Sequence, residues 1–127
     1  MLAGGIGITP LVSMCRYCTD TLSKTKVTLL YGCRTESDIA FKQELEYMQS
    51  QNDNLRTVFI LSESNANWRG PTGVINDEMV KRIIPDYKET LFYTCGPPQM
   101  VDVMEKIVQS IGLPKTQLRR EYFSGYT

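Results

Sequence analysis

The sequence predicts a three-layer α/β fold, in which an open, mostly parallel sheet of five strands lies between helices on both of its faces. Short apolar runs rich in β-branched and aromatic residues alternate with stretches of helical periodicity along the chain. The apolar runs are nearly continuous, which is typical of strands covered on both faces. No linker interrupts this alternation, so a single domain spanning residues 1–127 is expected.

The strands are expected where the apolar runs lie. The first is truncated to Met1-Leu2-Ala3, because a glycine-rich segment follows it directly. The other four are expected at Lys26–Gly32, Arg56–Ser62, Thr90–Cys95 and Leu118–Phe123. Because the first strand is so short, part of the sheet interior is expected to be uncovered, which favours self-association.

Helix start signals precede the first two helical segments. Thr9 is expected to cap the first helix, with Pro10 at its first position. Thr35 and Asp38 have the spacing of a capping box for the second. Apolar residues then recur on one face of each helix, at Leu11, Met14, Cys15, Cys18 and Leu22 in the first and at Phe41, Leu45 and Met48 in the second.

The two later helices have clear limits. A short helix is expected from Asn76 to a point before Pro85, and the last begins after Pro98 and stops at Gly112. The resulting order of helices and strands is that of a Rossmann-like sheet. The last helix carries the most regular apolar stripe, formed by Met100, Val103, Met104, Ile107, Val108 and Ile111.

Composition argues against several classes of function. Lys plus Arg and Asp plus Glu number 14 each, which speaks against a nucleic-acid partner or a membrane surface, and no apolar run has the length of a membrane span. The chain has no histidine and only one C-x-x-C pair, Cys15 and Cys18, so no metal site is expected. The amino terminus lacks the pattern of a signal peptide, and reduced thiols in the cytoplasm are expected.

Glycine-bearing turns follow three of the expected strands. In GGIGITP, Gly5 and Gly7 allow close approach of the backbone to a ligand, and Thr9-Pro10 begins a helix whose free N–H groups favour an anion such as a pyrophosphate. A plain turn before a helix is the alternative, because the third glycine of the common dinucleotide fingerprint is missing. Since YGCRTESDIAF and TCGPPQM follow two other strands, all three turns are expected at the carboxyl edge of the sheet, where such folds bind ligands.

Four segments together resemble a known family. GGIGITP, YGCRTESDIAF, WRGPTG and CGPPQM, in this order, are similar to motifs of the pyridine-nucleotide-binding domain of the ferredoxin–NADP reductase superfamily, which includes cytochrome b5 reductases and the reductase components of oxygenases. The resemblance covers essentially the whole chain. It implies that hydride passes between a bound nicotinamide and a flavin, FAD or FMN, on a separate or missing domain. The R-x-Y-[ST] motif of the family's flavin domain is not found in this sequence.

The resemblance also implies site residues. Cys95 is expected beside the reacting carbon of the nicotinamide, and burial as a small strand-end residue is its alternative. Glu121 and Phe123 match an acidic residue and an aromatic near the flavin and complete the expected catalytic set, with burial in the core as the alternative for Phe123. The expected cofactor-binding residues are Gly5, Gly7, Ile8, Thr9, Pro10, Gly32, Arg34, Ser62, Glu63, Cys95, Gly96, Pro97 and Met100.

The residues after the third strand bear on the choice between NAD and NADP. Relatives that use NADP often carry Ser-Arg there, whereas this chain has Ser62-Glu63. The Glu63 carboxylate would repel a 2′-phosphate and accept hydrogen bonds from a free ribose hydroxyl, which favours NAD(H) over NADP(H). Arg34 leaves the choice open, because it can reach a phosphate or lie in solvent. Trp68 is expected either near the adenine or as a packing anchor.

Two functions of different classes fit these motifs. In the first, the chain is the NAD(H)-binding domain of a flavin-dependent oxidoreductase that passes electrons to a downstream acceptor. Hydride transfer needs the nicotinamide and the flavin in contact, so little or no activity is expected of the chain alone. In the second, the chain is a non-catalytic nucleotide-binding or subunit-docking module. A flavodoxin-like FMN site is a weaker third option, because GGIGITP lacks the hydroxyl-rich phosphate loop of such modules.

Overall fold

The computed structural model describes residues 1–4, 8–96 and 98–122 of the chain. Within this part, five strands form one sheet in the order β3-β2-β1-β4-β5, and every strand pair is parallel. The predicted α/β class is therefore confirmed, and the sheet is parallel throughout rather than mostly parallel. The strands are β1 (Leu2–Gly4), β2 (Val27–Cys33), β3 (Leu55–Leu61), β4 (Phe92–Gly96) and β5 (Leu118–Tyr122).

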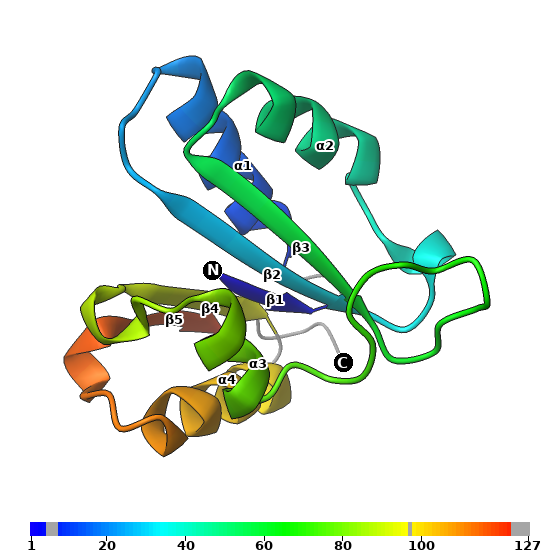
Figure 1. The fold of residues 1–127 in the computed structure, drawn as a ribbon. Helices are drawn as coiled ribbons and strands as arrows, with labels where there is room; N and C mark the ends of the chain where they lie inside the picture. The colour runs from blue at the N-terminus through cyan, green and yellow to red at the C-terminus, as the bar shows by residue number, and fades with distance from the viewer. Residues whose placement is uncertain (5–7, 97, 123–127) are drawn as a thin grey trace.

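Helices cover both faces of the sheet, as the sequence predicts (Figure 1). Helices α1 (Ile8–Asp20) and α2 (Lys42–Gln51) cover one face, and α3 (Asp77–Ile83) and α4 (Pro98–Ser110) cover the other. An ion pair between Arg16 and Glu44 joins α1 to α2. Short 3₁₀ turns lie at Glu36–Asp38 (η2), Tyr87–Glu89 (η3) and Lys115–Gln117 (η4).

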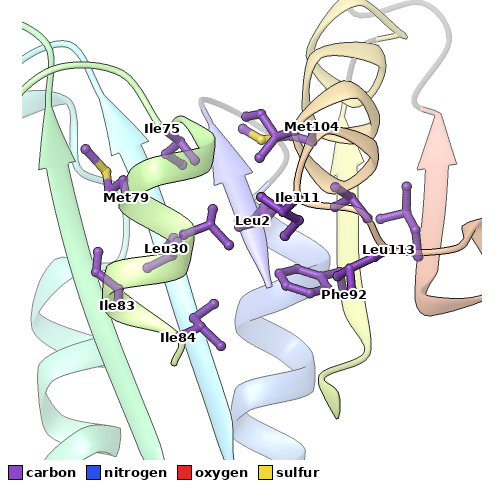
Figure 2. Packing of buried hydrophobic residues seen from close by; sticks show 14 of the residues in the cluster. Leu2, Leu30, Ile75, Met79, Ile83, Ile84, Phe92, Met104, Ile111 and Leu113 are labelled. Carbon is purple, nitrogen blue, oxygen red and sulfur yellow. The ribbon is translucent and has the colours of Figure 1, made fainter. Parts of the chain in front are cut away.

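The sheet separates two apolar cores. The α1–α2-side core includes Ala3, Ile8, Leu11, Cys15, Leu29, Tyr31, Leu45 and Cys95. The α3–α4-side core includes Leu2, Leu30, Ile60, Val80, Ile83, Phe92, Met104 and Val108. Figure 2 shows side chains from α3, such as Ile83, and from α4, such as Met104, converging over Leu2 and Leu30.

Strand β1 is short but central. It pairs with β2 through Leu2, Ala3 and Gly4, and with β4 through Leu2. Leu2 and Ala3 are completely buried, on opposite faces of the sheet, because neighbouring side chains of a strand alternate. These three residues therefore connect the two halves of the sheet and contribute to both cores.

Two predicted helix starts are wrong. Helix α1 begins at Ile8, so Thr9 and Pro10 lie inside its first turn instead of at its cap and first position. The capping box of Thr35 and Asp38 exists, but it caps the start of η2. Helix α2 begins later, at Lys42, after Phe41, whose backbone lies in the left-handed region at a φ of 60°. The spacing of Thr35 and Asp38 does produce a capping box, but that box stabilises η2 instead of α2.

Three residues of the predicted apolar faces are exposed, among them Phe41, which precedes α2 and is 41% exposed. Leu22 falls after the end of α1 and is 84% exposed, with a φ of 55°. Val103 is 49% exposed, although its neighbour Met104 is buried. Helical spacing alone cannot separate a core position from an apolar residue at the edge of the stripe.

Candidate functional site

A pocket of about 570 Å³ opens at the carboxyl edge of the sheet, beside the ends of β1, β2 and β3. This volume lies in the range of small-molecule sites. Parallel sheets of this kind bind ligands at this edge, where the strand order reverses direction around β1. The residues lining this carboxyl-edge pocket are Ala3, Gly4, Gly32, Cys33, Arg34, Asp38, Ser62, Gly73, Val74, Ile75, Met100, Val103 and Met104.

Two glycines form part of its floor. A Cβ atom on Gly4 would lie 3.1 Å from the Met100 sulfur, and one on Gly32 would lie 3.5 Å from Ile75 Cδ1. Gly4 and Gly32 are also paired in register across β1 and β2. Two adjacent strands thus lack a side chain near their carboxyl ends, so a ligand can approach the backbone closely there.

The wall of the pocket opposite β2 is apolar. Helix α4 contributes Met100, Val103 and Met104, and the segment before α3 contributes Val74 and Ile75. Val74 is 69% exposed and Val103 is 49% exposed. Apolar side chains exposed at the rim of a concave site favour a ligand with a flat apolar part.

The other end of the pocket carries charge. Asp38 Oδ2 accepts hydrogen bonds from the Thr35 hydroxyl at 2.8 Å and from the Thr35 N–H at 3.1 Å, and the Arg34 Nε lies 3.7 Å from it. These hydrogen bonds, more than the nearby guanidinium, hold the pKa of Asp38 below its usual range. The pocket therefore presents a fixed carboxylate beside an arginine at the end of β2.

Backbone hydrogen bonds continue past the ends of β2 and β3. The Ser62 N–H donates to the Cys33 carbonyl at 3.0 Å, and the Glu63 N–H donates to the Arg34 carbonyl at 2.7 Å. Ser62 lines the pocket, whereas Glu63 is exposed and is not one of the lining residues among the described part of the chain. The residue expected to discriminate NAD from NADP thus lies outside the pocket wall.

The segment from Trp68 to Ile75 folds back over the end of β3. Trp68 Nε1 donates to the Pro71 carbonyl at 3.0 Å, and the Gly73 N–H donates to the Leu61 carbonyl at 2.8 Å. Gly73 has a φ of 103°, a conformation that favours glycine. This turn brings Val74 and Ile75 to the pocket, while Trp68 packs against the α1–α2-side core, which is its packing-anchor alternative.

Helix α1 begins at Ile8, which belongs to the same apolar core as Ala3 of β1. Ile8 is buried in the α1–α2-side core, Thr9 is exposed and Pro10 is half-buried. The first N–H groups of this 13-residue helix have no partner within the helix, which makes its start suited to an anion. Gly5 and Gly7 lie outside the described residues.

The end of β4 carries the remaining expected residues. Cys95 is 4% exposed and packs in the α1–α2-side core, and its register partner in β5 is Glu121. Gly96 ends β4, and Met100 reaches the carboxyl-edge pocket from α4. Pro97 and Phe123 lie outside the described residues.

The structure thus brings Gly32, Arg34, Ser62 and Met100 together in one pocket. Several lining residues were missed because another role accounted for them: Asp38 was assigned to a cap, and Val103 and Met104 to a core stripe. The WRGPTG motif was the only signal for the Gly73 turn. The lining residues missed from the sequence are Ala3, Gly4, Cys33, Asp38, Gly73, Val74, Ile75, Val103 and Met104.

An open parallel sheet with a glycine-floored pocket at its carboxyl edge is typical of α/β nucleotide-binding domains. Residues 1–106 match the family model of the oxidoreductase NAD-binding domain. The chain belongs to this family and is the pyridine-nucleotide-binding domain of the ferredoxin–NADP reductase superfamily that the motifs predict.

Curated relatives agree with this assignment. A glycine betaine monooxygenase reductase subunit from Chromohalobacter salexigens is 32% identical over 126 residues, which is 97% of this chain and 34% of the relative. An NADH-cytochrome b5 reductase 1 from Candida albicans is 35% identical over 92% of this chain and 41% of the relative. The chain therefore spans about a third to two-fifths of the length of these relatives.

Solved structures share the fold. The cytochrome b5 reductase domain of Ulva prolifera nitrate reductase matches with a TM-score of 0.83 at 27% identity. The match covers 95% of this chain and 47% of the chain of that structure. The CS-b5R domains of human Ncb5or, in the NAD+ form, have a TM-score of 0.80 at 28% identity and cover 94% of this chain and 35% of their own. Within the described residues, no helix is long and apolar enough to cross a membrane.

Proposed function

We propose that this domain binds NAD(H) across the carboxyl edge of the sheet and positions the nicotinamide for hydride transfer to FAD or FMN on another domain or subunit. The observation that carries the proposal is the carboxyl-edge pocket, with its glycine floor, its apolar wall and the carboxylate of Asp38 at the end of β2. NAD(H), when bound, supplies the hydride chemistry; the residues of this chain supply position and orientation.

The dinucleotide is proposed to run from the pocket toward the end of β4. The adenosine half would occupy the pocket, with the adenine against Met100 and Val103 and the ribose beside Asp38. The pyrophosphate would lie at the start of α1, where free N–H groups and the helix dipole favour an anion. The nicotinamide would then reach the region of Cys95 and Gly96, at the strand on the other side of β1.

The same geometry favours NAD(H) over NADP(H). Asp38 lines the pocket as an anion, so it would accept hydrogen bonds from the adenosine ribose hydroxyls and repel a 2′-phosphate. Arg34 would attract such a phosphate, but its guanidinium lies 3.7 Å from Asp38 and is partly neutralised there. Asp38 and Glu63 are both exposed, but only Asp38 lines the pocket, so we assign the leading role in this choice to Asp38.

The flavin side of the proposal concerns the end of the sheet around β4 and β5. Cys95 would help to shape the nicotinamide site, and Glu121 and Phe123 keep the flavin-side role that the resemblance implies. Electrons would leave the flavin for a downstream one-electron acceptor or an oxygenase. Because two ring systems must touch for hydride transfer, the chain alone is proposed to bind NADH without oxidising it.

The first test is calorimetric titration of the folded chain with NADH and, separately, with NADPH. We expect saturable binding that is tighter for NADH. Trp68 is the only tryptophan of the chain, so quenching of its emission offers a second readout of the same titration. Absence of binding by either cofactor would leave the chain as a docking module.

A second test separates the enzymatic role from simple nucleotide binding. The chain is mixed with the separately expressed flavin domain of a related reductase, and NADH oxidation is followed with ferricyanide as acceptor. Turnover that needs both components supports the proposal. Tight NADH binding without any turnover in such mixtures would favour a non-catalytic nucleotide-binding module.

A further inference from the structure

A separate pocket of about 360 Å³ lies along the outer edge of β3, and we name it the β3-edge pocket. β3 is an outer strand of the sheet, so one side of its backbone has no neighbouring strand (Figure 1). The residues lining this pocket are Gln49, Arg56, Thr57, Val58, Phe59, Trp68, Gly70 and Pro71. None of them lines the carboxyl-edge pocket, so the proposed nucleotide site does not account for the β3-edge pocket.

Hydrogen bonds show which backbone groups of β3 face this outer edge. The Thr57 N–H donates to Gln49 Oε1 at 2.6 Å, and the Leu61 N–H donates to the Pro71 carbonyl at 3.3 Å. Thr57 and Leu61 therefore face away from β2. The N–H and C=O groups of alternate residues in a strand point to the same side, so Phe59, midway between these two residues, also faces outward.

The chain covers the edge of β3 on both sides of Phe59 but not at Phe59 itself. Gln49 occupies the Thr57 N–H, and Thr72 forms an isolated parallel bridge with Leu61. Among the described residues, no side chain or loop forms a hydrogen bond with the Phe59 N–H or C=O. The Thr57 hydroxyl oxygen is buried and also has no partner in this part of the chain. An edge with such open groups can pair with a further extended chain.

The two sides of the β3-edge pocket differ in character. Phe59 and Trp68 pack against the α1–α2-side core, whereas Val58 packs against the α3–α4-side core. Because side chains alternate along a strand, Arg56 lies on the same side as Val58. The exposed Arg56 guanidinium donates a 3.4 Å hydrogen bond to the Ile83 carbonyl and forms no ion pair with a described residue. One side of the pocket is therefore aromatic, and the other offers a positive charge to an anionic group.

We propose that the β3-edge pocket binds an extended peptide segment of a partner protein, in which acidic and apolar residues alternate. The backbone of the peptide pairs with the N–H and C=O of Phe59 and with the C=O of Thr57. Its acidic side chains face Arg56, and its apolar side chains face Trp68, because neighbouring side chains of a strand point to opposite sides. The stretch from Thr57 to Leu61 has a length of roughly 13 Å, so about four residues of the peptide contact β3.

A peptide suits this edge better than a second copy of the chain. If two copies paired in antiparallel fashion around Phe59, Thr57 of each copy would lie opposite Leu61 of the other. The backbone of Leu61 is already bonded to Pro71 and Gly73, so it has no N–H or C=O to offer on that side. The pairing would also bring together two arginines without a carboxylate between them. A free peptide needs only the groups that the chain leaves open.

The first experiment selects binding peptides for the folded chain from a phage-displayed library of random octapeptides. We expect the selected peptides to carry acidic residues at alternate positions with apolar residues between them. Their affinity, measured by calorimetry, should fall by at least about tenfold on the Arg56→Glu chain. Lys106→Glu is the matched control, because it makes the same change of charge on the exposed side of α4, and it should change the affinity by less than about twofold. Arg56→Lys keeps the charge and should retain most of the binding.

The second experiment tests whether the bound peptide is paired as a strand. Hydrogen exchange of the Phe59 amide should slow by at least about tenfold when a selected peptide saturates the chain. Methylation of the peptide nitrogens at one set of alternate positions should abolish binding, because those N–H groups face β3. Methylation of the other set should change the affinity by less than about threefold. Trp68 is the only tryptophan of the chain, so a change in its emission reports contact with the aromatic side of the pocket.

Three results would overturn the proposal. The first is a selection that enriches no peptide, and the second is a set of peptides that bind the Arg56→Glu chain equally well and leave Phe59 exchange unchanged. The third is a dimer of the chain in sedimentation that Arg56→Glu dissociates, because a second copy would then occupy the edge. NADH affinity of the Arg56→Glu chain is expected to be unchanged, since Arg56 lies near the amino end of β3 and outside the carboxyl-edge pocket. A failure of nucleotide binding is thereby distinguished from a failure of peptide binding.

Discussion

Arg34 and Asp38 lie one helical turn apart in sequence, and the Arg34 Nε is 3.7 Å from the Asp38 carboxylate. Both side chains line the carboxyl-edge pocket. The pair presents one cationic and one anionic group to the same ligand, and the two groups have opposite preferences for a 2′-phosphate. Two hydrogen bonds from Thr35 fix Asp38, whereas the Arg34 side chain is largely exposed. The fixed partner is expected to decide cofactor choice.

Replacing Asp38 with Asn should weaken the preference for NADH. The amide has nearly the same size but no charge, so it cannot repel a 2′-phosphate, and Arg34 becomes free to attract one. The ratio of NADPH to NADH affinity should rise by about tenfold in calorimetric titrations. Glu63→Gln removes the same charge outside the pocket and should change the ratio by less than about twofold. If Glu63→Gln raised this ratio more than Asp38→Asn, Glu63 would be the residue that discriminates NADH from NADPH.

A charge placed on the apolar wall should block the adenosine half. Val103→Asp puts a carboxylate at the rim of the pocket, and NADH affinity should fall by about tenfold or more. Because Val103 is 49% exposed, the unfolding temperature should change little. Tyr17→Asp is the control, since Tyr17 is 69% exposed on α1 and does not line the pocket. Equal affinities for the two variants would show that the ligand does not contact this wall.

Stability should fall as the pH falls from about 8 to about 6. The Met1 amino group has its pKa lowered from 8.0 to about 6 in the folded state, so the unfolded chain binds the proton more readily in this window. The loss should be about 2–3 kcal/mol, measured by urea unfolding at a series of pH values. The chain has no histidine, so no ordinary histidine titration overlaps this range. Acetylation of the amino terminus should flatten the curve, and a slope that survives acetylation would exclude this origin.

At alkaline pH the sign is reversed. Burial raises the pKa of Cys15 from 9.0 to about 11 and that of Tyr31 from 10.0 to about 12. Both groups ionise more readily in the unfolded chain, so stability should fall as the pH rises above about 9. Cys15→Ala should remove the part of this loss of stability that begins just above about pH 9. Cys18→Ala is its control, because Cys18 is only half-buried on the same helix.

The cap of α3 should matter for both stability and the site. Asn76 Oδ1 accepts a hydrogen bond from the Met79 N–H at 2.9 Å and directly follows Ile75 of the pocket wall. Asn76→Ala should cost about 1 kcal/mol, seen as a fall of a few degrees in the unfolding temperature. Asn76→Asp keeps the acceptor and should retain most of the stability. If both substitutions cost the same, the cap hydrogen bond is not the cause.

Much of the fold follows from sequence because local and tertiary signals agree. The strand runs, the apolar faces of α1 and α4, and the cap at Asn76 each point to the element that forms. The predictions fail where the same residue pattern fits two different structural roles. Thr35 and Asp38 have capping-box spacing, but tertiary packing decides that this box caps η2. Phe41 then separates η2 from α2. Val103 has the spacing of a core residue, but nothing in the sequence reports that α4 presents it to the pocket.

The candidate site is predictable to the level of its edge of the sheet but not of its wall. The motifs identify the ends of β1, β2 and β3, because turns after parallel strands meet there. The contribution of Gly73, Val74 and Ile75 depends on a backbone turn that folds back over Leu61, and such long-range returns leave little local pattern. The placement of Glu63 outside the wall likewise depends on where the β2 and β3 ladder ends, at hydrogen bonds such as that from Glu63 to Arg34.

The central position of β1 has a consequence for synthesis on the ribosome. Residues 1–61 contain β1, β2 and β3 together with α1 and α2, so this nascent portion can pair three strands and cover one face. Its other face, with Leu2, Leu30 and Ile60, stays bare until α3 and α4 emerge. At cellular translation rates that interval lasts a few seconds. An apolar sheet surface is thus exposed during every round of translation. The yield of this domain in a host cell should therefore depend on how many chaperones are free to bind that surface in this time.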